Sequence, residues 1–175
     1  MGIDKINTDI DSDSDLQVQA TGLNAGRADV SAMEAKLKEM GYGDLHKDIL
    51  FNPDGKISTI RFKIKDLNGK VISQLYVTLK STGYDIYDRK TDFEHRGRGL
   101  AALLLKQVES LISQHSKGES STIYLDTTQS SVIGFMEKNG YTFKGGKPDL
   151  SKEEIIYEQD GDIFYDGRYR LEKTI

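Results

Sequence analysis

The sequence of 175 residues contains no cysteine, and this absence excludes disulfide bonds, thiol nucleophiles and metal sites built on cysteine. Its three histidines lie far apart along the chain, which argues against a zinc site. No apolar run is long enough for a membrane-spanning helix or for the apolar part of a signal peptide. We therefore expect a cytoplasmic protein without a bound metal ion, although export by another route stays open.

An excess of positive charge is also absent. The net charge is -4, which argues against general binding to nucleic acids or to anionic membranes. Hydrophobic residues make up 37% and charged residues 30% of the chain, as in ordinary globular proteins. The length fits one domain with a core of its own.

The first 27 residues are poor in large apolar side chains, and aspartates recur there at positions 9, 11, 13 and 15. The spacing lacks the glycine and the closing glutamate of a calcium-binding loop. We expect residues 1–27 to form a disordered acidic tail and residues 28–175 to form a single domain.

Periodicity predicts the elements of that domain. Ser31 and Glu34 have the spacing of a capping box, and a helix should follow them to Gly41. Strands are expected at residues 48–52, 56–66, 71–80, 84–93, 121–127 and 165–173, with a further strand opening at residue 141 and turns at 160–161 or 166–167. Helices are expected at 101–115 and from Ser130 or Ser131 to residue 139. A strand after a long helix predicts a crossover with parallel pairing.

The segment at residues 94–101 connects an expected strand to an expected helix, and it reads Glu-His-Arg-Gly-Arg-Gly-Leu-Ala. Unpaired N–H groups and the dipole at a helix N-terminus attract anions, and glycines let an anion approach the backbone. The segment therefore predicts a phosphate cradle, with a tight turn and two solvated arginines as the alternative. It is neither a P-loop nor the dinucleotide fingerprint, because the third glycine position is Ala102.

Two blocks resemble the GNAT acetyltransferase superfamily. Arg96-x-x-Gly99-x-Ala101 matches its acyl-CoA signature, and residues 135–141, Phe-Met-Glu-Lys-Asn-Gly-Tyr, follow residues 123–127 as the family's late helix follows its late strand. The resemblance spans about residues 56–144. It implies an α+β fold, with a mostly antiparallel, twisted sheet and helices on both faces.

The resemblance also implies an activity, which is transfer of an acetyl group from acetyl-CoA to a primary amine of a small molecule, peptide or protein, without a metal. Acetyl-CoA would be bound by residues of the fourth strand and of the turn after it, namely Thr91, Phe93, Arg96, Gly97, Arg98, Gly99, Leu100 and Ala101. The acceptor and the oligomeric state stay open at this point.

An amine must lose a proton before it attacks, so a base or a water relay is needed. Candidates are Asp85, Asp88, Glu94 and His95, with Asp126 further away. Many relatives place a tyrosine acid where this chain has Met136, so we expect Tyr141, Tyr124 or Tyr87 to be the acid if one exists. This departure also favours a second hypothesis, a non-catalytic acyl-CoA-binding or protein-interaction module, and a third, a partner-binding protein that keeps only the fold.

The C-terminal region is acidic and aromatic, with Glu153, Glu154, Glu158, Asp160, Asp162 and Asp166 among Tyr157, Phe164 and Tyr165. In the GNAT family the loop before the last strand borders the acceptor. A rim of this kind favours a cationic amine, and a solvated hairpin is the alternative.

Overall fold

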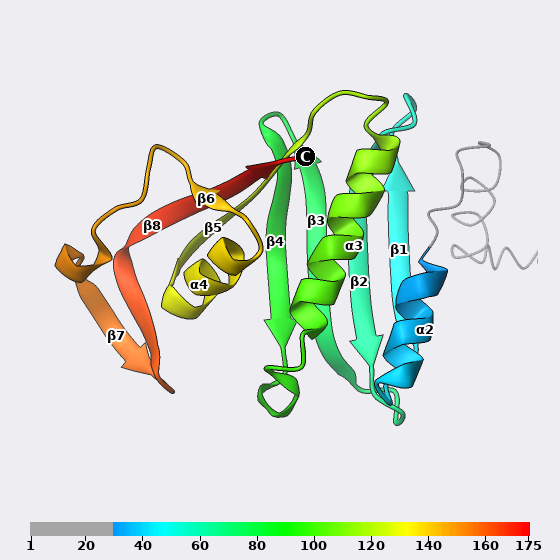
Figure 1. Ribbon diagram of the computed structural model, residues 1–175, viewed down its shortest axis with the longest axis horizontal. Helices are drawn as coiled ribbons and strands as arrows, with labels where there is room; N and C mark the ends of the chain where they lie inside the picture. Colours follow the sequence, from blue (N-terminus) through cyan, green and yellow to red (C-terminus); the bar gives the residue numbers. More distant parts are fainter. Residues whose placement is uncertain (1–29) are drawn as a thin grey trace, which may run out of the picture.

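The computed structural model describes residues 30–175, and the expected acidic tail at residues 1–27 lies outside this range. The described residues form an eight-stranded sheet with helices packed on it (Figure 1). In chain order the elements are α2 (Ser31–Glu39), β1 (Leu45–Phe51), β2 (Ile57–Lys65), β3 (Val71–Lys80), β4 (Gly83–Thr91), the 3-10 helix η1 (Phe93–His95), α3 (Leu100–His115), β5 (Thr122–Gln129), α4 (Ser130–Lys138), β6 (Thr142–Phe143), the 3-10 helix η2 (Leu150–Lys152), β7 (Ile155–Gln159) and β8 (Asp162–Thr174).

The sheet has the order β1-β2-β3-β4-β5-β8-β6, and β7 pairs with β8 beside β6. Strands β1 to β4 form an antiparallel meander. Helix α3 is the crossover that makes β5 parallel to β4, as predicted from the sequence. Strand β8 then runs antiparallel to β5. The predicted α+β fold with a mostly antiparallel sheet is confirmed.

The two faces of the sheet differ in polarity. On β2 the side chains of Ile60, Phe62 and Ile64 are fully buried, while Arg61 between them is exposed. Helices α2, α3 and α4 all cover the apolar face (Figure 1). The expectation of helices on both faces is therefore met on one face only within residues 30–175. The reason is that the other face carries polar side chains, which do not need to be covered.

Several contacts fix the helices on the apolar face. The ring of Phe51 on β1 lies 5.3 Å from that of His115 at the end of α3. The guanidinium of Arg89 on β4 lies 4.6 Å from the ring of Phe135 on α4. Apolar side chains of all three helices and of the sheet join one buried cluster. Its burial supplies the main stabilising free energy.

The start of β4 is pressed closely against β5. A Cβ atom at Gly83 would lie 2.4 Å from the carbonyl oxygen of Thr122, and the φ angle of Gly83 is +131°. Only glycine fits both conditions. This contact lets the first residues of β4 pair with those of β5.

Three local predictions need correction. Val30, and not Ser31, is the N-cap of α2, so the expected capping box does not form, and Glu34 pairs with Lys47 at 2.8 Å. Strand β4 ends at Thr91, because the chain turns into η1. The sequence also gave no sign of β7, since all its residues are exposed and their burial does not alternate.

The region around Gly167 also differs from expectation. The pair at 166–167, one of two proposed turns, lies inside β8, and the turn is at 160–161. A Cβ atom at Gly167 would lie 2.5 Å from the hydroxyl oxygen of Tyr169. Glycine is needed there for this side chain and not for a turn.

Candidate functional site

The turn between β4 and α3 joins the end of a strand to the N-terminus of a helix, the arrangement on which the predicted phosphate cradle depends. Gly97 and Gly99 have φ angles of +75° and +79°, and nothing lies within 4 Å of a Cβ atom built on either. Gly99 is the N-cap of α3, and its carbonyl accepts from the N–H of Leu103 at 2.9 Å. The N–H groups of Leu100 to Ala102 therefore have no partner within the helix.

A cavity of about 590 Å³ opens at this turn, between the N-terminal part of α3 and one side of α4. It is lined by Arg89, Lys90, Thr91, His95, Arg96, Gly97, Gly99, Leu100, Ala101, Ala102, Gln129, Ser131, Phe135, Lys138 and Asn139. Six of the eight predicted cofactor residues line it, and Phe93 and Arg98 do not. The side chains near its mouth include the cations Arg96 and Lys138.

The position of the cavity follows from the divergence of β4 and β5. Their parallel pairing consists of Tyr84 with Ile123 and Asp85 with Tyr124. A bulge follows in β4, where Val77 of β3 pairs with Ile86 but Tyr76 pairs with Asp88. Bulges bend a strand and redirect its edge. The later residues of β4, including Arg89 and Thr91, therefore present an edge toward the cavity that is not paired with β5.

The two arginines of the turn behave differently. Arg96 donates from Nε to the carbonyl of Thr91 at 3.2 Å, and its guanidinium lies 5.5 Å from the ring of Phe93, which is 74% exposed. Arg98 donates to the hydroxyl of Tyr42 at 3.3 Å. Arg96 therefore faces the cavity, and Arg98 fixes the loop after α2 to the turn.

Two further groups in the cavity were not predicted as cofactor ligands. The pKa of Arg89 is lowered, mainly by burial and also by the positive charge of Arg96. The negative charge of Asp162 acts in the opposite direction but does not cancel this shift. The ring of His95 lies 5.7 Å from that of Tyr42, and its Nδ1 atom is buried without a hydrogen-bond partner among residues 30–175. A half-buried cation and a buried unpaired ring nitrogen fit a ligand that carries polar groups.

The N-terminus of α4 forms one wall of the cavity and is fixed by Asp162 of β8. This carboxylate accepts from the hydroxyl of Ser130 at 2.7 Å, from the N–H and hydroxyl of Ser131 at 2.8 and 2.6 Å, and from the amide of Gln129. Burial opposes its ionisation, but the bonds from Ser131, Ser130 and Gln129 outweigh burial and hold the pKa of Asp162 at about 2.

Of the candidate bases named from the sequence, His95 lines this cavity, whereas Asp85, Asp88 and Glu94 do not. Asp85 and Asp88 belong to β4, and Asp88 accepts from the side-chain amide of Gln74 at 2.8 Å. Asp88 is paired with Tyr76, whose side chain lies on the polar face of the sheet, where Lys63 sits 5.8 Å from its ring. Glu94 lies in η1 and is exposed.

The tyrosine candidates divide between core and surface. Tyr141 is 2% exposed, and burial, with the charge of Glu109 beside it, raises the pKa of its hydroxyl above the usual range. Tyr124 is also buried, with the Arg170 guanidinium 4.1 Å from its ring, and Tyr87 is exposed. Met136 is fully buried and does not line the cavity, whereas Phe135 beside it does.

Asp126, a more distant candidate, is engaged in an ion pair. It binds Arg170 through both carboxylate oxygens at 2.8 Å. The hydrogen bonds from Arg170 lower the pKa of Asp126. A carboxylate held in this way is a poor proton acceptor near neutral pH.

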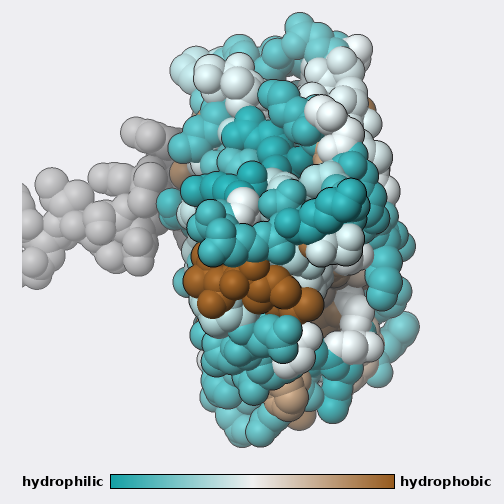
Figure 2. All heavy atoms as spheres, turned by 90° about the vertical axis from the view of Figure 1, so that its left-hand side faces the viewer, coloured by the Kyte–Doolittle hydropathy of each residue, from teal (hydrophilic) through white to brown (hydrophobic). Residues whose placement is uncertain are grey.

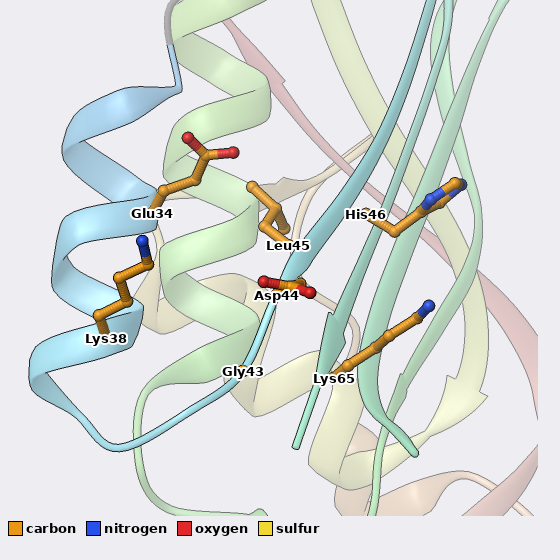
Figure 3. A pocket seen from close by; sticks show the side chains of 7 residues that line it. All are labelled: Glu34, Lys38, Gly43, Asp44, Leu45, His46 and Lys65. Carbon is orange, nitrogen blue, oxygen red and sulfur yellow. The ribbon is translucent and has the colours of Figure 1, made fainter. Parts of the chain in front are cut away.

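A second cavity, of about 430 Å³, lies between α2 and the start of β1 (Figure 3). Figure 3 shows Glu34 and Lys38 on α2, with His46 and Lys65 pointing away from that helix. Its charges are mixed in sign and do not converge, so it has no feature of an anion or cofactor site.

Residues 30–175 offer neither a metal site nor a membrane span. No three histidine, aspartate or glutamate side chains there could together hold a metal ion. No described helix is both long enough and apolar enough to cross a membrane.

No protein-family model and no curated protein sequence matches the chain. Among solved structures, the IAA acetyltransferase from Bacillus cereus ATCC 14579 aligns with a TM-score of 0.50 at 16% identity, covering 75% of this chain and 100% of its own.

Two further structures are similar. A GNAT family acetyltransferase from Elizabethkingia anophelis with acetyl-CoA bound has a TM-score of 0.48 at 16% identity, over 67% of this chain and 77% of its own. An acyl-CoA N-acyltransferase from Pseudomonas aeruginosa has a TM-score of 0.43 at 14% identity, over 66% and 68%. Identities this low concern the fold alone. On the alignment with the Bacillus cereus structure, the chain has the fold of that acetyltransferase.

Proposed function

We propose that this chain is an acetyl-CoA-dependent N-acetyltransferase that acts on a primary amine of a small molecule, peptide or protein. One observation carries the proposal. The edge of β4 beyond the β4–β5 pairing leads along a single cavity to the N-terminus of α3. A ligand with an amide-bearing arm and a pyrophosphate fits this order of strand edge, cavity and helix N-terminus. The solved relatives named above, which include an acetyl-CoA complex, have this fold.

The chain's own residues would hold the co-substrate as follows. The N–H groups from Gly97 to Ala102, with Arg96, would bind the pyrophosphate. The backbone edge at Thr91 would pair with the amides of the pantetheine arm, as an added strand does. Acetyl-CoA, when bound, supplies an acetyl group already activated as a thioester. The protein therefore has to orient the two substrates and manage protons.

The acceptor amine has to lose a proton. The pKa of a lysine-like amine is about 10.4, so at pH 7.5 only about one molecule in a thousand is unprotonated. We assign the base to Asp88, acting directly or through water, because it lies on β4 just past the bulge. Gln74 would hold one of its oxygens in place. Asp85, Glu94 and Tyr141 stay as further candidates, with Tyr141 the weakest because it is buried in the core.

The second candidate function is a non-catalytic acyl-CoA-binding module. It is favoured by Met136, whose buried thioether stands where many relatives have an acid. A thiol has a pKa of about 8.5, so a departing thiolate can take a proton from water, and the missing acid does not by itself exclude transfer.

Calorimetry tests the site. Acetyl-CoA should bind, and the Gly99→Glu variant should bind at least about tenfold more weakly, because a carboxylate would occupy the anion position. The matched control is Gly145→Glu, since Gly145 also has a positive φ angle, +83°, and open space around it. Equal affinity in the wild type and in Gly99→Glu would remove the cofactor from this turn.

A transfer assay separates the two functions. CoA release with polyamines and basic peptides should rise between pH 6 and pH 9 as the amine loses its proton. The Asp88→Asn variant should release CoA more slowly with unchanged affinity for acetyl-CoA. Binding without release, for any amine of the panel, would favour the non-catalytic module.

A further inference from the structure

Strand β7 lies at the end of the sheet opposite β1, and one of its edges has no partner strand within residues 30–175. It pairs with β8 on one edge, and no strand within residues 30–175 pairs with its other edge. All five of its residues are exposed. Its outer backbone N–H and C=O groups are therefore free to pair with another extended chain.

The open strand carries apolar side chains. Ile155, Ile156 and Tyr157 are 49%, 58% and 49% exposed, and Tyr157 stacks on Phe164 of β8 at 4.3 Å. Figure 2 shows an apolar patch surrounded by polar side chains on the side of the molecule where β7 and β8 lie. An apolar patch with a polar border is typical of an interaction surface. Natural edge strands usually avoid such side chains.

All charged side chains between residues 153 and 166 are acidic, while Lys152 and Arg168 flank this segment. Residues 153–166 contain six acidic residues and neither lysine nor arginine. Glu158 lies within β7, and Glu154 directly precedes it. A partner on this edge must therefore offer backbone pairing, apolar side chains and positive charge.

We propose that β7 docks an extended peptide in which basic and apolar residues alternate, and that the peptide joins the sheet as an added strand. This mode of recognition takes its affinity from backbone hydrogen bonds and its specificity from the side chains. Five residues of strand span about 17 Å, which is enough for a segment of five to seven residues. Binding here needs neither acetyl-CoA nor transfer, so its failure and that of the proposed reaction are separable.

A second copy of the chain is a poorer occupant of the same edge. In an antiparallel pairing centred on Ile156, Glu154 of one copy lies opposite Glu158 of the other. Like charges directly opposite each other destabilise a strand pair. An acidic peptide and an anionic membrane are disfavoured for the same reason.

The test uses three seven-residue peptides with blocked ends, measured by calorimetry. The first alternates lysine and valine, the second has glutamate for lysine, and the third is the lysine peptide with alternate backbone nitrogens methylated. The lysine peptide should bind, and more weakly at high salt, because the attraction is screened. The methylated peptide should bind at least about tenfold more weakly, because it loses edge hydrogen bonds. The glutamate peptide should not bind.

Two exposed substitutions locate the site. Ile156→Lys should weaken binding of the lysine peptide about tenfold through lost apolar contact and repulsion, and Glu158→Lys should weaken it severalfold. The control is Glu39→Lys on α2, an exposed glutamate far along the sheet, which should have no effect. No binding of the lysine peptide, equal binding of the glutamate peptide, or indifference to both β7 variants would overturn the proposal. A dimer in analytical ultracentrifugation that Ile156→Lys abolishes would also overturn it, in favour of self-pairing.

Discussion

Replacing Asp162 with asparagine should loosen the N-terminus of α4. The carboxylate of Asp162 accepts hydrogen bonds from two hydroxyls, a side-chain amide and a backbone N–H. The N-cap residue of α4, Gln129, makes no side-chain cap hydrogen bond. Asp162 of β8 therefore takes the place of a helix cap. Asparagine keeps the shape but offers one acceptor oxygen in place of two and has no charge.

Two estimates of the magnitude agree. The pKa of Asp162 falls from 3.8 to about 2 on folding. At about 1.4 kcal/mol per pKa unit, and with allowance for partial exposure, this corresponds to about 1–2 kcal/mol of stability. Loss of an N-cap costs a similar amount, about 1–2 kcal/mol. For a chain of this size we expect Tm to fall by about 3–6 °C at pH 7.

The sign of the pH dependence is fixed by the direction of the shift. A carboxyl whose pKa is depressed in the folded state contributes stability above its unfolded pKa, and this contribution is lost as the pH falls through the folded value. The difference in stability between wild type and Asp162→Asn should therefore be full at pH 7 and fade between about pH 4 and pH 2.

Thermal unfolding followed by circular dichroism at several pH values measures this difference. Glu158→Gln, which removes a charge from the exposed strand β7, is the control and should leave Tm unchanged within about 1 °C. Acetyl-CoA should also bind more weakly to Asp162→Asn, because Gln129 and Ser131 line the cavity. An unchanged Tm at pH 7, or the same difference at pH 7 and pH 2, would refute the reasoning.

Two further substitutions test other contacts. Met136→Tyr places a larger side chain in a fully buried position, so Tm should fall by a few degrees. The kcat for CoA release should change by less than about tenfold. A hundredfold rise in steady-state CoA release would show that a missing acid was the main barrier. Asp126→Asn breaks the ion pair that both carboxylate oxygens make with Arg170. The free energy of unfolding measured in urea should fall by about 1–3 kcal/mol at pH 7. It should fall by less in acid, because the wild-type carboxyl gains a proton there, and equal losses at both pH values would contradict the ionic contribution.

Much of the fold could be predicted because its elements leave periodic patterns. The alternation along β2 and the spacing in α3 each follow from one buried face, so both elements were found within a residue or two. The turn at Gly97 and Gly99 was also predictable, since a glycine-rich stretch lies between a strand pattern and a helix pattern, and both glycines have positive φ angles. Strand β7 was missed because neither of its faces is buried, and no pattern of burial can mark it in the sequence.

The candidate site was harder to predict, because it depends on tertiary contacts. Arg89 looks like one more polar residue of an alternating strand, and only the bulge in β4 turns its side chain toward Phe135. Asp162 looked like part of an acidic hairpin, but β8 brings it to α4, more than thirty residues earlier in the chain. The sequence could not separate Tyr141 from the surface tyrosines, since burial alone distinguishes them.

Strands β4 and β5 pair only through their first residues, within the part of the chain that the structure describes. Gly83 allows the two strands to touch at their first residues, and the bulge near Tyr87 lets them part afterwards. The cavity with its cationic turn opens on the helical face of this break, while Asp88 and Gln74 pair near it from strands β4 and β3. Under the proposed function, Asp88 would therefore have to reach the acceptor amine from the face of the sheet opposite the cavity.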